Sequence, residues 1–110
     1  MNREQWSTRL NENGNALGAL LGISFGQDWV DDYGKPWTNV VDGFVRERRR
    51  DRAVAALAEL DELLAGDLAD ADLEWLLLEG VHAAVDWDRF GYPTWRAWLQ
   101  ALRDELARLC

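Results

Sequence analysis

Apolar residues recur every three or four positions along most of this 110-residue chain, and no stretch alternates regularly between apolar and polar residues. That spacing gathers apolar side chains on one face of a helix, whereas a half-buried strand requires alternation. We therefore predict an all-α fold without a β-sheet. The connections are short, so four to five helices are expected to pack roughly antiparallel as a small compact bundle.

The first clear apolar stripe runs from Leu17 to Phe25. It contains Gly18 and Gly22, and each glycine costs roughly 1 kcal/mol relative to alanine inside a helix. Glycines four residues apart also allow another backbone to approach that helix face closely, so we interpret them as packing residues. Residues 33–36 combine a glycine with a proline and mark the clearest break in the chain.

Further helices are predicted over residues 37–49, 52–65, 70–80 and 94–109. Asp51, Asp70 and Thr94 stand where N-caps are expected, and Gly66 stands at a predicted left-handed C-cap. The buried stripe of the segment 52–65 is predicted to consist of Val54, Leu57, Leu60 and Leu64. The last helix has the clearest amphipathic pattern, with an apolar face made of Trp95, Trp98, Leu99, Leu102, Leu106 and Leu109. Residues 81–93 show no clear periodicity.

The composition is typical of one folded domain. Nearly half of the residues are apolar and seven are tryptophan, which provides enough apolar surface to offset the entropy lost on ordering the chain. The single cysteine, Cys110, excludes an intrachain disulfide and favours a reducing compartment. No apolar run has the length of a signal peptide or of a membrane span. We therefore expect a cytoplasmic protein that does not associate with membranes.

The charge is distributed unevenly along the chain. The net charge is −8, and residues 54–88 contain ten acidic residues and no lysine or arginine. Such a surface repels nucleic acid and accelerates the encounter with a basic partner, although acidity is also common for solubility alone. The arginine-rich segment 46–52 is interpreted as a helix C-terminus whose cations complement the helix dipole and pair with nearby acids.

Catalytic and metal-binding chemistry is poorly supported by the residue types present. His82 is the only histidine, and no serine or cysteine lies in the context of a nucleophile. A calcium loop beginning at Asp67 would place Asp72 where glycine is needed and Leu78 where glutamate is needed. We therefore predict no catalytic residue, no metal site and no cofactor.

Six of the seven tryptophans fall into two groups. Four of them lie on or beside apolar stripes and are predicted to be core residues: Trp29, Trp37, Trp95 and Trp98. Trp75 and Trp87 instead lie within the acidic stretch, and Trp87 has Asp86 and Asp88 as direct neighbours. A large rigid apolar side chain surrounded by charge is typical of an interface anchor, while burial in the core remains the other interpretation.

One short box resembles a known family. Residues 24–29 read SFGQDW and are followed by a tyrosine at position 33. The residues Phe25, Gln27, Asp28, Trp29 and Tyr33 resemble the "YFHQDW" box of the immunity proteins of contact-dependent growth inhibition systems, with Ser24 in place of the usual tyrosine and Gly26 in place of the usual histidine. Residues 95–99 are similar to the late "WL" helix of that family.

The resemblance implies a function. Proteins of this family bind and neutralise the C-terminal toxin domain of a large effector, often a nuclease, and their genes lie directly beside the toxin gene. For this chain it implies a basic toxin domain as partner, stoichiometric occlusion by an acidic surface, no nucleic-acid partner, and a monomer in preference to an oligomer. We expect the box to be structural, and the toxin-binding residues to be Asp61, Glu62, Asp67, Asp70, Asp72, Glu74, Asp86, Trp87 and Asp88.

Two other functions remain open from the sequence. One is an acidic helical module that binds a regulatory partner unrelated to toxins. The other is a small domain that uses its carboxylates to bind a metal ion. Gene context distinguishes the first from an immunity protein, and thermal stabilisation by a divalent cation reveals the second.

Overall fold

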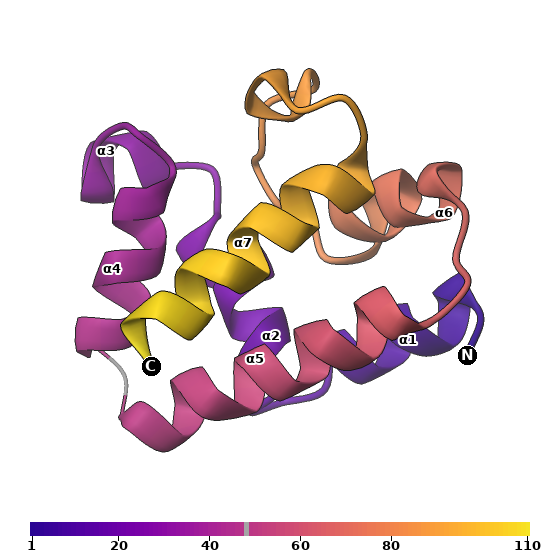
Figure 1. The fold of residues 1–110 in the computed structure, drawn as a ribbon, viewed down its shortest axis with the longest axis horizontal. Coiled ribbons are helices and arrows are strands. Elements are labelled where there is room, and N and C mark those ends of the chain that lie inside the picture. Colours follow the sequence, from indigo (N-terminus) through magenta and orange to yellow (C-terminus); the bar gives the residue numbers. More distant parts are fainter. Residues whose placement is uncertain (48) are drawn as a thin grey trace.

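The architecture is entirely helical in residues 1–47 and 49–110, which are the residues that the computed structural model describes (Figure 1). Seven α-helices, two π-helical turns and one 3₁₀ turn follow one another in this part of the chain, with no strand, so the predicted all-α fold is confirmed. Their bounds are α1 Arg3–Leu10, α2 Ala16–Ala19, η1 Leu20–Ser24, α3 Trp29–Tyr33, α4 Thr38–Glu47, α5 Arg50–Ala65, α6 Asp70–Trp75, η2 Leu76–Gly80, η3 Arg89–Gly91 and α7 Trp95–Leu109.

The C-terminal helix α7 crosses the middle of the molecule and organises the core (Figure 1). Helices α5 and α4 pack against it, and α5 also packs against α2. The predicted cap is confirmed, because the Thr94 hydroxyl accepts a hydrogen bond from the Ala97 amide at 3.0 Å. The predicted apolar face is confirmed as well, with five of its six residues buried: Trp95, Trp98, Leu99, Leu102 and Leu106.

Helices α2 and α6 both end in a π-helical turn. The Phe25 amide donates to the Leu20 carbonyl at 2.9 Å, and the Val81 amide donates to the Leu76 carbonyl at 3.0 Å. Each turn therefore carries one residue more than an α-helical turn. Such turns are frequent near functional sites, because they alter the direction in which the following residues leave the helix.

The buried stripe predicted for the segment 52–65 is wrong at Val54, while Leu60 is buried and Leu57 and Leu64 pack half-buried against the core. Val54 is 47% exposed, whereas Ala53, Ala56 and Leu63 are buried together with Leu60. Helix α5 lies against both α2 and α7. Its alanines face the neighbours, because small side chains allow the helix axes to approach one another.

The predicted ends of α5 are also wrong. Arg49, not Asp51, occupies the N-cap position, and Gly66 has an extended backbone with φ −75° instead of a left-handed one. Helix α3 was not predicted at all, because a five-residue helix is too short to show periodicity. The helix predicted through residue 49 is described to Glu47 only, since residue 48 lies outside the described residues.

Asp70 joins α6 to α7 and does not cap its own helix as predicted. Ala69 occupies that N-cap. The two carboxylate oxygens of Asp70 instead accept the amides of Trp95 and Arg96, at 3.2 and 3.0 Å. These amides belong to the first turn of α7, where backbone donors lack intrahelical partners. The carboxylate of Asp70 is thus already engaged in the fold.

The two packing glycines act as expected. A Cβ atom at Gly18 would lie 1.8 Å from the Leu10 carbonyl oxygen, so α2 touches the end of α1 through its backbone. A Cβ atom at Gly22 would lie 3.0 Å from the Val81 carbonyl oxygen. Both close approaches hold the turn η1 against the rest of the chain.

Candidate functional site

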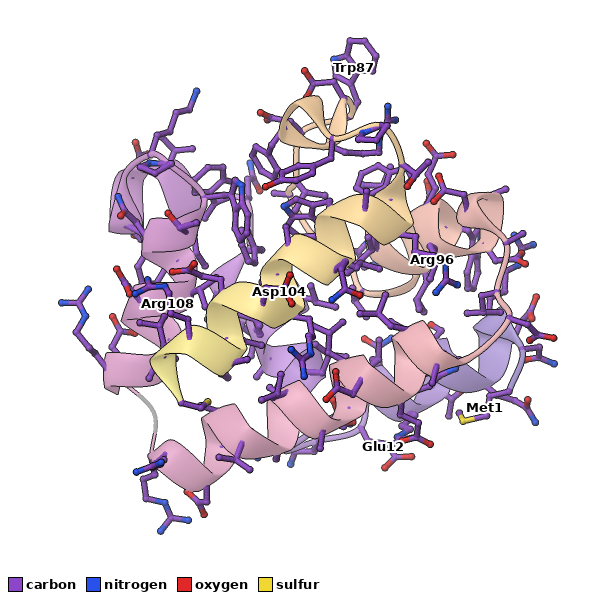
Figure 2. The ribbon with its side chains drawn as sticks, in the orientation of Figure 1. Met1, Glu12, Trp87, Arg96, Asp104 and Arg108 are labelled. Atoms are coloured by element: carbon purple, nitrogen blue, oxygen red, sulfur yellow. The ribbon has the colours of Figure 1, made fainter. Side chains whose placement is uncertain are left out.

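Trp87 is the most exposed large apolar side chain of the molecule as described. It is 82% exposed and lies at the tip of the segment between η2 and α7, pointing away from the body of the protein (Figure 2). The interpretation of Trp87 as a core residue is therefore wrong. Trp75 is half-buried, with the Arg3 guanidinium 4.6 Å from the centroid of its ring.

Phe90 attaches the Trp87 loop, residues 81–94, to the core. Its ring lies between three indoles, with centroid distances of 5.9 Å to Trp29, 6.3 Å to Trp37 and 5.8 Å to Trp98. The Asp88 carboxylate accepts the Phe90 amide at 3.2 Å, which fixes the short turn between the exposed and the anchored aromatic residue. Asp88 therefore has a structural hydrogen bond as well as its predicted role in binding.

The backbone of the loop is held in an uncommon conformation. Arg89 and Phe90 have φ values of 57° and 55°, in the left-handed region that non-glycine residues rarely adopt, and Gly91 follows at 88°. Such conformations persist only where the surroundings impose them. Here the Arg89 guanidinium donates to the carbonyls of Tyr92 at 2.9 Å and Trp87 at 3.5 Å.

The family-like box also holds the Trp87 loop in place. The Ala84 amide donates to the Phe25 carbonyl at 2.7 Å, and the Trp29 indole donates to the Ala84 carbonyl at 2.7 Å. Phe25 and Trp29 thus satisfy both backbone groups of one residue near the start of the loop. The Phe25 ring also packs edge-on against Trp98, at a centroid distance of 5.6 Å. These contacts are the structural role that we expected of the box.

The other residues of the box lie elsewhere. Gln27 and Asp28 are exposed, and Asp28 occupies the N-cap position of α3 without a side-chain hydrogen bond to the helix. The Tyr33 hydroxyl donates to the Glu47 carboxylate at 3.2 Å. The Tyr33 ring covers Gly43, where a Cβ atom would lie 2.2 Å from its Cε1.

Tyr33 provides a prediction about alkaline pH. Burial raises the pKa of Tyr33, and the nearby Glu47 carboxylate raises it further. Because the pKa is higher in the folded chain than the unfolded value of about 10, the contribution of neutral Tyr33 to stability is complete below that value and is lost as the pH rises through the folded pKa. The tyrosinate absorbance of the wild type minus that of Tyr33→Phe should have a midpoint above 10 in buffer, and about 10 in denaturant. Equal midpoints would contradict this assignment.

Five of the predicted binding carboxylates already have partners in the fold, and one of them is Asp88 with the Phe90 amide. The Asp61 carboxylate lies 2.7 Å from the Arg103 guanidinium, and the Asp72 carboxylate lies 3.6 Å from the Arg3 guanidinium. Glu62 lies 2.7 Å from Arg9, and their hydrogen bond lowers the pKa of Glu62. Asp70 bonds α7, as described above. A surface ion pair is weak and exposed enough for a binding partner to replace it.

Three predicted carboxylates remain free among the residues that the structure describes. They are exposed, and their carboxylate oxygens form no hydrogen bond or ion pair within that part of the chain: Asp67, Glu74 and Asp86. The acidic stretch is therefore divided among α5, α6 and the Trp87 loop. Continuity in sequence does not place these residues on one uniform surface.

A pocket of about 790 Å³ reaches Asp86, the residue before Trp87. Its walls come from α3, from the connection between α3 and α4, and from the Trp87 loop. It is lined by Trp29, Lys35, Pro36, Trp37, Asp86, Phe90, Gly91 and Tyr92. Sequence analysis missed this pocket, although the unassigned segment 81–93 next to an acid-flanked tryptophan was the available signal.

The described residues contain neither a metal-binding cluster nor a membrane-spanning helix. No group of three or more His, Cys, Asp or Glu side chains is arranged there to hold a metal ion. No described helix is both long and apolar enough to span a membrane.

Comparisons with known proteins identify what the chain resembles. A family model described as "CdiI immunity protein" matches residues 13–106. The chain is also similar to one chain of the crystal structure of the CdiA-CT/CdiI complex from Y. kristensenii 33638, with a TM-score of 0.74 and 22% identity over 83% of this chain and 95% of that chain. At this identity the likeness shows a shared fold. No curated protein matches.

Proposed function

Because this chain belongs to the CdiI immunity protein family, we propose that it binds and neutralises the contact-dependent toxin domain encoded beside its own gene. Family membership supports the role of inhibitor and not that of enzyme. The proposal adds to this role a binding surface and a mechanism.

The observation that carries the binding surface is the exposure of Trp87. A side chain of this size, 82% exposed, holds a large apolar area in water, and a partner that buries it would gain from removing that area from water. Tryptophan is also enriched among the residues that dominate binding energy. Its loop is held in advance by Phe90 and Arg89, so little conformational entropy is lost when the partner binds.

The mechanism we propose is occlusion of a basic active site. A nuclease must present positive charge to hold phosphates, and an acidic inhibitor with a net charge of −8 is attracted to the same surface. Association is then accelerated by charge, while dissociation is slowed by the buried tryptophan. We expect one immunity protein to bind one toxin domain as a monomer in the cytoplasm.

The test is reconstitution with the toxin domain encoded beside this gene. We expect growth to be restored when both proteins are co-expressed, a one-to-one complex in sedimentation, and loss of the toxin's activity, RNA or DNA cleavage being assayed first. A toxin that kills regardless of this chain, with no complex formed, would contradict the proposed function. A complex that leaves the toxin fully active would contradict occlusion.

The acidic surface yields a separate prediction. Reversing two free carboxylates, by Asp67→Lys with Glu74→Lys, should slow association with the toxin domain about tenfold at low salt, with a smaller difference at high salt. The matched control makes the same charge change on the family-like box, by Asp28→Lys with Asp31→Lys. Stopped-flow tryptophan fluorescence measures both rates. If association slows more in the control variant, the electrostatic contact lies at the family-like box and not at the acidic residues near α6.

A further inference from the structure

The geometry points to a specific occupant for the pocket beside Trp87: one arginine side chain of the toxin domain, stacked between aromatic rings and paired with Asp86. This inference rests on the proposed function, because it concerns the same interface. It goes further by naming the chemistry that the partner must present.

The walls of the pocket favour a cation. Trp29, Trp37, Phe90 and Tyr92 line it. The faces of aromatic rings carry partial negative charge and attract ammonium and guanidinium groups within about 6 Å of the ring centroid. A volume of about 790 Å³ is enough to receive a whole side chain.

The ionised groups around the pocket also favour a cation. Asp86 is exposed, and within the described chain its carboxylate oxygens bond no other group. Asp88 already accepts the Phe90 amide, and Arg89 already donates to the Tyr92 carbonyl. Asp86 is therefore the acid that remains available for an incoming charge.

Lys35 is the opposing charge in the lining. It is exposed, and its ammonium group has no hydrogen bond or ion pair to any described residue. Its long flexible side chain can turn toward solvent when a cation enters, whereas the aromatic walls cannot move away. An anionic occupant would be attracted by Lys35 alone, and it would be repelled by the aromatic walls and by Asp86.

Arginine fits better than lysine for geometric reasons. Its guanidinium is planar, so it stacks on an indole or phenyl ring, and it pairs with a carboxylate through two parallel hydrogen bonds. Asp86 lines the pocket and directly precedes Trp87, so the exposed indole and the pocket are joined by one short stretch of the Trp87 loop. The two contacts thus form one interface.

The first test uses the toxin domain encoded beside this gene and calorimetric titration. Asp86→Asn keeps the shape and removes the charge, and we expect it to weaken binding by 10- to 30-fold, roughly the effect of losing a charged hydrogen bond. Glu12→Gln is the matched control, because it removes the same charge at the opposite edge of the molecule (Figure 2). Lys35→Met should leave the affinity unchanged or raise it.

The outcomes separate the two proposals. If the wild-type chain does not bind the toxin domain, the proposed function fails. If the wild type binds tightly but Asp86→Asn is no weaker than Glu12→Gln, that function stands and the arginine pocket is overturned. A larger loss of affinity for Lys35→Met than for Asp86→Asn also overturns the arginine pocket, because that result indicates an acidic occupant. Unchanged melting temperatures establish that each variant is folded.

A second test needs no toxin. The probes are N-acetyl-arginine amide and its neutral analogue N-acetyl-citrulline amide, which has nearly the same shape. Addition of the arginine compound at millimolar concentration should shift the indole N–H resonances of Trp29 and Trp37 in the wild type, and less in Asp86→Asn. Equal shifts with both compounds would overturn a site that selects a cation.

Discussion

Replacing Trp87 with alanine should weaken binding to the toxin domain by roughly 30-fold or more, or about 2 kcal/mol, without destabilising the fold. The side chain is 82% exposed in the free protein, so its removal costs few internal contacts. In the complex the same side chain would lose most of its exposed apolar area. Titration calorimetry for the affinity and urea unfolding for the stability measure the two effects.

The control for this prediction is Trp75→Ala. Trp75 lies in the same acidic stretch but is half-buried beneath the Arg3 guanidinium. Its removal should lower the stability and leave the affinity of the folded protein nearly unchanged. If Trp87→Ala binds the toxin as tightly as the wild type, the interface lies on another face.

Replacing Gly18 with alanine should destabilise the protein by about 3 kcal/mol or more, at the upper end of the cost of overpacking a core. The added methyl group would lie 1.8 Å from the Leu10 carbonyl oxygen and 2.8 Å from its carbonyl carbon. These are backbone atoms, so no change of side-chain rotamer removes the overlap.

The end of α1 also cannot shift easily. The Asn11 side chain donates to the carbonyls of Ser7 and Gly80, both at 2.8 Å, and ties α1 to η2. Moving Leu10 away from α2 would strain the bond to Gly80, because the bond to Ser7 lies within α1 and moves with it. The predicted cost is a substantial fraction of the roughly 5–15 kcal/mol by which small domains are stable.

Gly66→Ala is the matched control for Gly18→Ala. At Gly66 the backbone φ is −75°, and the nearest atom to an added Cβ is the Leu63 carbonyl oxygen at 3.4 Å, an ordinary contact. We expect this variant to be neutral or slightly more stable, because alanine restricts the unfolded chain. Equal urea midpoints for the two variants would show that α1 and α2 do not meet through Gly18.

The supporting role of the box agrees with these predictions. Phe25 and Trp29 hold the backbone of Ala84, while Phe90 is enclosed by the same aromatic cluster. A change in the box is thus transmitted through the Ala84 backbone to the position of Trp87. We expect large box substitutions to lower stability and affinity together, unlike Trp87→Ala.

The sequence by itself determined the helical class and the face of α7. Periodicity sufficed there, because the residues from Trp95 to Leu106 repeat on one helix face whichever neighbour covers it. The Thr94 cap was predictable for a similar reason, since it depends on local backbone geometry. The spacing of Gly18 and Gly22 predicted a close approach, but only the structure shows that Leu10 and Val81 make it.

Only the tertiary structure decided which acidic and aromatic residues are available for binding. Asp70 is engaged by α7, Val54 faces solvent in place of Ala53, and Trp87 is exposed while Trp98 is buried. Each of these outcomes depends on which segment, distant in sequence, lies opposite the residue. Local propensity carries no information about that segment. The pocket beside Trp87 could therefore be identified only in the tertiary structure, where α3 and the Trp87 loop together form its walls.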